Sequence, residues 1–395
     1  MTQQKNLFKK IIGQFHLWLG LTSGLVVLIL GITGCIYAFE QELQDMTQPY
    51  RFTQQVEGKA LPLSELTAIA QKESPEKDLR RMYQPGEGRS TMALFYGEGG
   101  YYDAVFLDPI SGEVLKKKNM RADFFTIILF LHTTLLIPYG DIVASTACLI
   151  FVILMISGII LWMPKNKAAS KQRFRIRWNS SWKRVNYDLH SVLGFYMSWV
   201  AIFTAISGVT MGFDWFKSSV YWVASGGEIL PKEFAYKSDF EVVTPEEKAN
   251  PMDVIFEDVK KRHPENSFFA YYLPIQKEDP IQVLTSSKLG LYYNRQMHYF
   301  DQYSLQEKTN IHPARSGDYA MASFADKLVR LDIDIHTGAI AGLTGKVLAF
   351  FASLIATSLP ITGFLLWRGR KKKGVSGKRK LMGRINDDSM VTSTN

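Results

Sequence analysis

Cysteine is scarce in this sequence of 395 residues: there are only two, Cys35 and Cys148, and both lie inside apolar runs. No CxxC or CxxCH motif occurs. The sequence therefore excludes a thiol zinc site, covalent haem attachment and a disulfide framework. A dinucleotide-binding fingerprint and a flavin motif are also absent, so the chain is not expected to take hydride from a nicotinamide by itself.

Acidic residues are scarce in three segments that are rich in basic residues. Residues 1–10, 164–188 and 368–395 hold 20 of the 46 lysines and arginines but only three of the 37 acidic residues. Because positive loops remain on the cytoplasmic side of a membrane, both termini and the 164–188 loop are expected in the cytoplasm. Topology and anionic lipid explain such basic runs, and no nucleic-acid partner is expected.

Four stretches are apolar for about 20 residues or more, the length that crosses a ~30 Å hydrocarbon core. They are nearly uncharged and lie at residues 11–39, 142–163, 192–213 and 345–367. The first lacks a small-x-small cleavage site, which favours a retained helix over a signal peptide. The sequence therefore predicts four membrane spans.

A segment that begins with histidine occurs twice and opens two of these runs. In each copy the histidine is followed after four residues by one glycine and after eighteen by another: His16, Gly20 and Gly34, then His190, Gly194 and Gly208. A hydroxyl residue, Thr33 or Ser207, stands just before the second glycine.

Each of these segments is followed, later in the same repeat, by a second segment that also bears a histidine. His132 and His336 precede runs that close with a hydroxyl residue, a glycine and a tryptophan: Ser157, Gly158 and Trp162, then Thr362, Gly363 and Trp367. Turn residues 138–140 follow His132, and Gly338 follows His336, so each is expected on a short segment. The chain is thus a tandem repeat with four equivalent histidines.

The two long segments between spans have α+β patterns that echo each other. The first, residues 40–123, predicts a helix and two strands before the turn sequence Asp-Pro-x-Ser-Gly at Asp108: 61–72, 91–96 and 101–107. The second, residues 214–335, predicts a helix and four strands: 252–261, 268–273, 281–286, 290–294 and 297–300. Asp301 aligns with Asp108, and residues 310–325 are expected to be an irregular connection.

These motifs resemble those of the PepSY-associated transmembrane family of iron-regulated membrane proteins. The resemblance covers nearly the whole chain and includes the His-xxx-Gly helix starts, the closing Gly-xxx-Trp of two spans and the Asp-Pro-x-Ser-Gly-Glu turn. It implies a bacterial inner-membrane protein with two periplasmic PepSY modules. Some members are similar to haem-containing reductases of ferric siderophores, whereas others are known only as PepSY proteins.

The expected fold class is a membrane all-α four-helix bundle, built as two tandem repeats of helix, module and helix, with two small extracytoplasmic α+β PepSY-like modules. The expected segments in chain order are 1–39, 40–123, 124–163, 164–188, 189–213, 214–335, 336–367 and 368–395. Spans and the histidine-bearing segments fall in 1–39, 124–163, 189–213 and 336–367.

Depth in the membrane sorts the four histidines into two pairs. His16 and His190 are expected at the cytoplasmic ends of their helices, and His132 and His336 at the external ends. Two ligands of one metal lie only ~4 Å apart, far less than the ~30 Å core, so ligands of one metal must come from the same depth. The resemblance implies two b-type haems, each held by two histidines.

Gly20 and Gly194 lie one turn beyond their histidines, on the same helix face, where the missing side chain would leave room for a macrocycle. Close helix–helix packing is the alternative for these glycines. For the histidines, a non-haem metal, a proton path and a purely structural role stay open. His263, His298 and His312 have no repeat partner and are expected at the surface.

The function implied by the resemblance is that of a di-haem reductase that passes electrons across the membrane to a ferric siderophore or another ferric chelate, for iron acquisition. The electrons would come from a quinol or a separate cytoplasmic reductase. Aromatic residues of the external segments would shape a substrate cleft or form an interfacial belt: Tyr101, Tyr102, Trp215, Tyr221, Trp222, Tyr292 and Tyr293. The rival functions are a non-enzymatic PepSY scaffold or regulator, and a histidine-lined metal transporter.

Overall fold

The computed structural model describes residues 2–53, 57–164, 173–233, 236–239, 250–308 and 311–391. The chain divides into two compact units. The membrane unit comprises Met1–Cys35, Leu131–Val209 and Val347–Asn395, and the sheet unit comprises Ile36–Phe130 and Thr210–Lys346. Lys165, Lys167 and Lys171, which contribute to the basic loop in the topology prediction, lie outside the described residues.

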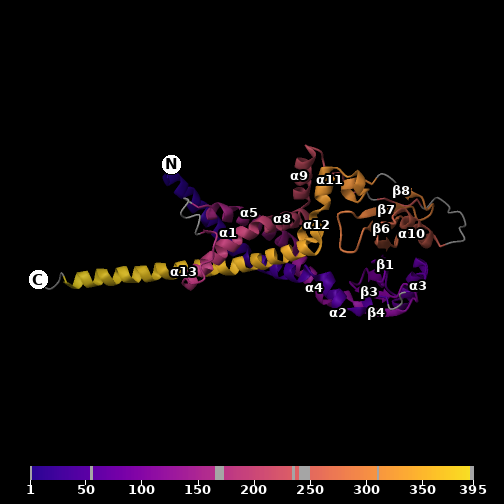
Figure 1. Ribbon diagram of the computed structural model, residues 1–395, viewed down its shortest axis with the longest axis horizontal. Coiled ribbons are helices and arrows are strands. Elements are labelled where there is room, and N and C mark those ends of the chain that lie inside the picture. Colours follow the sequence, from indigo (N-terminus) through magenta and orange to yellow (C-terminus); the bar gives the residue numbers. More distant parts are fainter. Residues whose placement is uncertain are drawn as a thin grey trace. The chain divides into compact units, whose positions relative to one another are not determined.

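Four helices are long and apolar enough to cross a membrane, as the sequence predicts: Leu7–Tyr37, Gly140–Trp162, Trp182–Gly212 and Ala339–Gly369. They belong to α1 (Thr2–Tyr37), α5 (Gly140–Trp162), the continuous α7 (Trp182–Asp188), η3 (Leu189–Leu193) and α8 (Gly194–Gly212), and α13 (Gly342–Val391). Figure 1 labels α1, α5, α8 and α13. Large apolar side chains point outward on them; Leu25 is 68% exposed and Phe203 60%. Such all-round apolarity is typical of helices that face lipid.

Small residues allow these helices to approach closely. A Cβ built on Gly31 of α1 would lie 2.1 Å from Thr357 Oγ1 of α13, so only glycine fits there. Ala201, Ala205 and Ala352 are buried together with Met155, joining α5, α8 and α13. Small residues at helix contacts are the usual means of packing in a membrane, where apolar burial gives little driving force between helices.

The sheet unit contains one antiparallel sheet of eight strands in the order β4-β3-β2-β1-β5-β6-β7-β8 (Figure 1). The strands are β1 (Leu79–Gln84), β2 (Thr91–Tyr96), β3 (Tyr102–Leu107), β4 (Val114–Asn119), β5 (Phe268–Tyr272), β6 (Ile281–Ser286), β7 (Gln296–Phe300) and β8 (Glu307–Lys308). The helices α3 (Leu63–Glu73) and α10 (Pro251–Arg262) share one buried core on one face of this sheet. Helix and strand predictions at 61–72, 91–96, 101–107, 252–261, 268–273, 281–286 and 297–300 are confirmed to within a few residues.

The remaining helices that the structure describes are short. They are α2 (Glu40–Thr47), η1 (Pro49–Arg51), η2 (Met120–Ala122), α4 (Phe124–Thr134), α9 (Asp214–Ser225), η4 (Pro313–Arg315), η5 (Tyr319–Met321), α11 (Phe324–Arg330), α12 (Asp332–Thr337) and η6 (Ala339–Ala341). Residues 311–323 have only single-turn helices, which agrees with the predicted irregular connection.

The two halves of the sheet are related by a local two-fold symmetry that is visible in the strand register. The β1–β5 pair, where the two repeats join, is the seam of the sheet. Successive cross-strand partners outward from the seam lie on one face of the sheet: Met82, Ala93 and Val105 in the first repeat, and Tyr271, Val283 and His298 in the second. Met82 pairs with Tyr271 at the centre of this relation. The repeat-related aspartates lie three residues after the outermost members of the two series: Asp108 after Val105, and Asp301 after His298. The tandem repeat is therefore a structural repeat.

The predicted fold class is wrong, because the chain is not an all-α bundle with two separate small modules. The strands of both modules join in a single eight-stranded sheet through four residue pairs between β1 and β5. Each module alone would leave its first strand as an open edge with unpaired N–H and C=O groups, and pairing these edges satisfies both.

The predicted strand at 290–294 is also wrong. Gly290 has a φ of +86°, and the N–H groups of Tyr292 and Tyr293 donate to the carboxylate of Asp334. Since these donors serve a side chain of α12, they are not available to a neighbouring strand.

The predicted turn at Asp108 is confirmed and recurs in the second repeat. Asp108 Oδ1 accepts from the N–H groups of Ile110 and Ser111, and Asp301 Oδ1 accepts from those of Tyr303 and Ser304. Four residues beyond each aspartate the chain turns left-handed, with φ +74° at Gly112 and +55° at Leu305. A leucine in this conformation is strained, and the aspartate bonds hold the turn against that strain.

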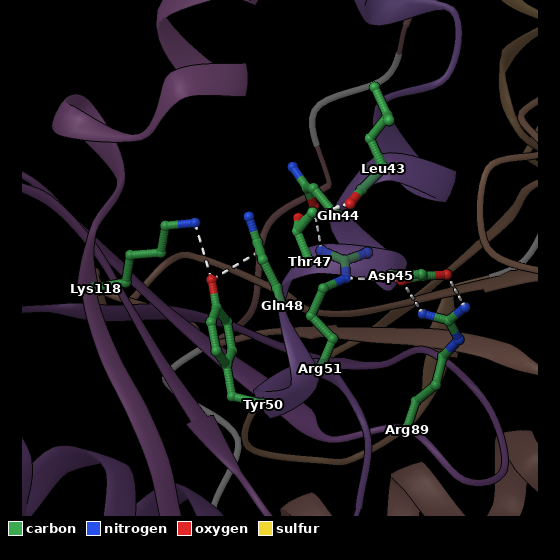
Figure 2. Close-up of polar contacts among 9 residues, drawn as sticks. All are labelled: Leu43, Gln44, Asp45, Thr47, Gln48, Tyr50, Arg51, Arg89 and Lys118. Atoms are coloured by element: carbon green, nitrogen blue, oxygen red, sulfur yellow. Dashed lines mark hydrogen bonds and ion pairs between the residues drawn. The ribbon is translucent and has the colours of Figure 1, made fainter.

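A polar network ties α2 and η1 to the sheet. Figure 2 shows Asp45 between two arginines: it accepts from Arg51 Nε at 2.9 Å and from Arg89 Nη1 at 3.0 Å. Lys118 of β4 donates to the hydroxyl of Tyr50, which donates in turn to Gln48. The pKa of Asp45 is below its usual range because the bonds from Arg89 and Arg51 outweigh the opposing effect of burial.

Candidate functional site

The rings of His16 and His190 meet inside the membrane unit, one from each repeat. Their centroids lie 6.3 Å apart and their planes cross at 85°. His16 lies on α1, and His190 lies on η3, a single π-helical turn inside the third span. Such turns are frequent at functional sites. Two imidazoles that bind one iron from opposite sides, with metal–nitrogen distances of ~2 Å, have centroids about 6 Å apart, so the observed separation fits two axial ligands.

A hydroxyl group holds each of these rings from the second span of the same repeat. His16 Nδ1 lies 2.9 Å from Ser157 Oγ of α5, and His190 Nδ1 lies 2.9 Å from Thr362 Oγ1 of α13. Both hydroxyl–glycine pairs are evident in the sequence, but the sequence does not indicate their partners. The symmetry of the pattern was a usable signal, since each histidine and each hydroxyl occurs once per repeat.

The hydroxyl protons are already used within their own helices. Ser157 donates to the carbonyl of Leu154, and Thr362 donates to the carbonyls of Ser358 and Leu359. Each hydroxyl oxygen therefore acts as acceptor toward the ring, and Nδ1 carries the ring proton. In this tautomer Nε2 has the lone pair that binds a metal, and an orienting partner on the other nitrogen is usual for metal-binding histidines.

A glycine lies beside each of the two histidine rings. A Cβ on Gly158 would lie 3.4 Å from His16 Cε1, and a Cβ on Gly363 would lie 3.2 Å from His190 Cε1. The glycine after each hydroxyl therefore lies directly beside the ring. A side chain at Gly363 would press against its ring, whereas the distance at Gly158 is at the limit of ordinary contact.

Gly20 and Gly194, the glycines that the sequence analysis assigned to cofactor binding, face leucines of neighbouring helices. A Cβ on Gly20 would meet Leu154 Cδ2 at 3.8 Å, and one on Gly194 would meet Leu359 Cδ2 at 3.5 Å. These are ordinary packing distances. Their role beside a cofactor stays a prediction, and the contacts with leucine give substance to the packing alternative.

The predicted external pair is divided between the two units. His132 lies on α4, where its Nδ1 is 2.8 Å from Thr33 Oγ1 of α1, and Thr33 donates to the carbonyl of Ile29. A glycine again lies beside the ring, since a Cβ on Gly34 would meet His132 Cε1 in ordinary contact at 3.5 Å. The arrangement repeats that of His16 and His190, with the roles of first and second span exchanged.

His336 lies on α12 in the sheet unit, so its pairing with His132 stays a prediction. Both external histidines lie on short helices, as predicted. After α4 the chain turns left-handed at Leu135, Leu136 and Tyr139 before α5 begins at Gly140.

The position of α12 is set by a buried carboxylate two residues before His336. Asp334 is fully buried and accepts N–H bonds from Tyr292 and Tyr293. Burial raises its pKa, although these bonds oppose the rise. The carboxylate thereby connects the helix that carries His336 to the loop before β7.

Several other predicted residues have different surroundings from those expected. His298 was expected at the surface and is buried, at 4% exposure, because it occupies an inward position of β7. Its Nδ1 lies 2.7 Å from Glu307 Oε1. His312 is exposed, as expected, and His263 is half-buried.

The aromatic residues expected to shape a substrate cleft or an interfacial belt differ in their exposure to solvent. Tyr221 is buried against α11 and donates to Asp326, whereas Trp215 and Trp222 are more than half exposed. Within the described ranges, no group of three or more histidine, cysteine, aspartate or glutamate side chains is arranged to hold a metal ion. A centre with two axial histidines needs only two such side chains.

Comparison with known proteins gives one family. The family model for the PepSY-associated TM region matches residues 14–370, which is nearly the whole chain and includes all four histidines of the repeat. Comparison with curated proteins gives no match.

Proposed function

Because the chain belongs to the PepSY-associated TM family of membrane proteins, as the sequence predicts, we propose that it is a b-type di-haem reductase of the inner membrane. In this proposal it passes electrons to a ferric siderophore or another ferric chelate on the periplasmic side. The electrons come from a quinol or from a separate cytoplasmic reductase. Both termini lie in the cytoplasm.

The observation that carries the proposal is the His16–His190 pair. Two imidazoles from different repeats lie at the separation of axial ligands, and a hydroxyl of a neighbouring helix orients each one. A structural histidine pair would not need the same orienting hydroxyl and the same close glycine on both sides. A haem bound here would supply a one-electron redox centre.

The residues of the chain have three tasks in this proposal. His16 and His190 would hold the inner haem through Nε2, and His132 and His336 would hold the outer one. Ser157, Thr362 and Thr33 keep the proton on Nδ1 of their histidines. The apolar helices around them keep the centres in a medium of low polarity, where second-shell hydrogen bonds have a large influence on potential.

The visible spectrum of the purified chain tests the cofactor. A dithionite-reducible b-type spectrum with about two haems per chain is expected. His16→Ala and His190→Ala should each remove one haem, and His132→Ala and His336→Ala the other. His312→Ala is the matched control, because that side chain is exposed and lies in the sheet unit. A purified, folded chain that takes up no haem would leave the scaffold and the metal transporter as the surviving functions.

Reoxidation of the reduced chain by a ferric chelate, followed by stopped flow, tests the reductase activity. In the proposal each ferric ion accepts one electron from the chain and becomes ferrous. His336→Ala should abolish reoxidation by the chelate while the inner haem stays reducible. Reoxidation at an unchanged rate in His336→Ala would exclude the outer haem as the exit.

A further inference from the structure

A cationic side chain lies on the face of the sheet that α3 and α10 do not cover. Arg81 belongs to β1 and pairs with Leu94 of β2 and Tyr272 of β5, so it lies at the seam between the two repeats. Its side chain points to the same side as Tyr83, because residues two apart on a strand share a face. The seam thus has a guanidinium near its centre.

Tyrosines surround this guanidinium. Its central carbon lies 4.5 Å from the ring centroid of Tyr272 and 5.3 Å from that of Tyr96, and Nη1 donates to the hydroxyl of Tyr83 at 3.1 Å. Tyr102, which pairs with Tyr96, is the fourth ring on this face. Burial raises the pKa of the hydroxyls of Tyr272 and Tyr102, so they remain neutral donors at physiological pH.

The charge of Arg81 is not balanced by a carboxylate within the part of the chain that the structure describes. Its Nε is buried without a hydrogen-bond partner. Two other part-buried arginines of the sheet unit, Arg51 and Arg89, share the carboxylate of Asp45. Arg330, which is more deeply buried, donates to four backbone carbonyls. A buried N–H group without a partner is costly unless something else supplies one.

The symmetry-related position in the second repeat has no cation. The two-fold relation that matches Met82 with Tyr271 also matches Tyr83 with Tyr272 and Arg81 with Ala270. Ala270 is fully buried and occupies its position in the second repeat without any polar group. The same strand position therefore folds with a methyl group, and the guanidinium in β1 is an addition to one repeat.

We propose that Arg81 and the tyrosines around it bind an organic anion with a planar conjugated group, of the aromatic carboxylate or catecholate class. A guanidinium presents its N–H groups in a plane that matches the oxygens of such an anion. Tyrosine rings on either side offer stacking surfaces for the flat group, and their hydroxyls offer further donors. This site goes beyond the electron transfer proposed above and does not depend on it.

Calorimetric titration of the full-length chain in detergent tests the site. The probes are 2,3-dihydroxybenzoate and benzoate, with benzamide as a neutral analogue of the same shape. Both anions should bind, and benzamide should bind at least ~10-fold more weakly, since it lacks the charge that pairs with the guanidinium. Arg81→Met should lower the affinity for the anions about 10- to 100-fold, the effect of losing charge-assisted hydrogen bonds.

Two further variants separate binding from folding. Arg81→Lys retains the charge but lacks the planar fork, so it should fold and bind more weakly than the wild type. Arg80→Met is the control, because Arg80 donates to a backbone carbonyl and to Asp78 and lies beside the same ring of Tyr96. Equal binding of benzamide, absence of anion binding by the wild type, or unchanged affinity in folded Arg81→Lys would each overturn the proposal.

Discussion

Met82 of β1 and Tyr271 of β5 lie opposite each other at the seam where the two repeats join, and both are almost completely buried. Their side chains belong to the core that α3 and α10 share. Since one core continues beneath both repeats, damage at the seam should spread to both halves of the sheet.

Met82→Ala is therefore expected to destabilise both halves of the sheet unit together. Loss of a buried methionine side chain costs about 2–5 kcal/mol. Limited proteolysis with mass spectrometry should show α3 and α10 becoming accessible at the same temperature. Met46→Ala is the control, since Met46 is 83% exposed. Separate transitions of the two halves would contradict a shared core.

Thr362→Val tests the hydroxyl that orients His190. Valine retains the shape of threonine but cannot accept the proton of Nδ1, so haem affinity is expected to fall about 10- to 100-fold. Haem titration followed by absorbance measures the change, and nitrogen chemical shifts of His190 report its tautomer without any haem. Ser358→Ala is the control on the same helix, because Ser358 donates only to the carbonyl of Ile355 among the bonds described for it. Equal tautomer populations in Thr362→Val and the wild type would refute the orienting role.

Gly363→Ala tests the space beside the ring. The added methyl group would lie 3.2 Å from His190 Cε1, so the ring must move and haem uptake should decrease. Gly20→Ala is the informative comparison, because its methyl group would meet Leu154 at 3.8 Å, an ordinary contact. If Gly20→Ala folds and yet loses haem, Gly20 leaves room for the cofactor; if it retains haem, the packing alternative holds.

Asp301→Asn should reduce stability in a pH-dependent way. Burial by itself raises the pKa of Asp301, but N–H donors from Ser304, Asp239 and Tyr303 outweigh it and hold the pKa below its usual range. The charged form is thus favoured by folding, and its contribution is complete above the ordinary pKa of about 3.9 and lost as pH falls through the lower folded value. Melting temperatures of wild type and variant should differ at pH 6, and the difference should shrink as the pH falls below the ordinary pKa. Asp258→Asn, at a mostly exposed side chain, is the control and should change the melting temperature less at pH 6.

The spans could be predicted from the sequence because length and apolarity alone decide whether a helix crosses a membrane. The turns at Asp108 and Asp301 were predictable because they too depend on local sequence: their hydrogen bonds join residues two or three apart. Strand β1 was missed because a bulge between Leu79 and Arg81 interrupts the alternation of buried and exposed residues. Its pairing with β5 joins residues nearly 190 positions apart, and no local pattern reports such a partner.

The candidate site was predictable in part. Repetition revealed the histidines, the hydroxyl residues and the glycines, but not which of them touch. Ser157 meets His16 only because α1 and α5 pack with a particular rotation, which depends on small side chains all along the helices. The Arg81 cluster had no sequence signal, since its tyrosines come from four strands.

The symmetric seam also bears on how such a chain arose. Two identical strands that pair antiparallel about one residue place that residue opposite itself, which is the geometry of a two-fold homodimer. A chain with only one repeat would end its sheet at β1, and a second copy of that chain would complete it by the pairing now made by Met82 and Tyr271. Gene duplication and fusion would then have preserved an existing dimer within one polypeptide, after which each copy was able to diverge, as Arg81 and Ala270 have done.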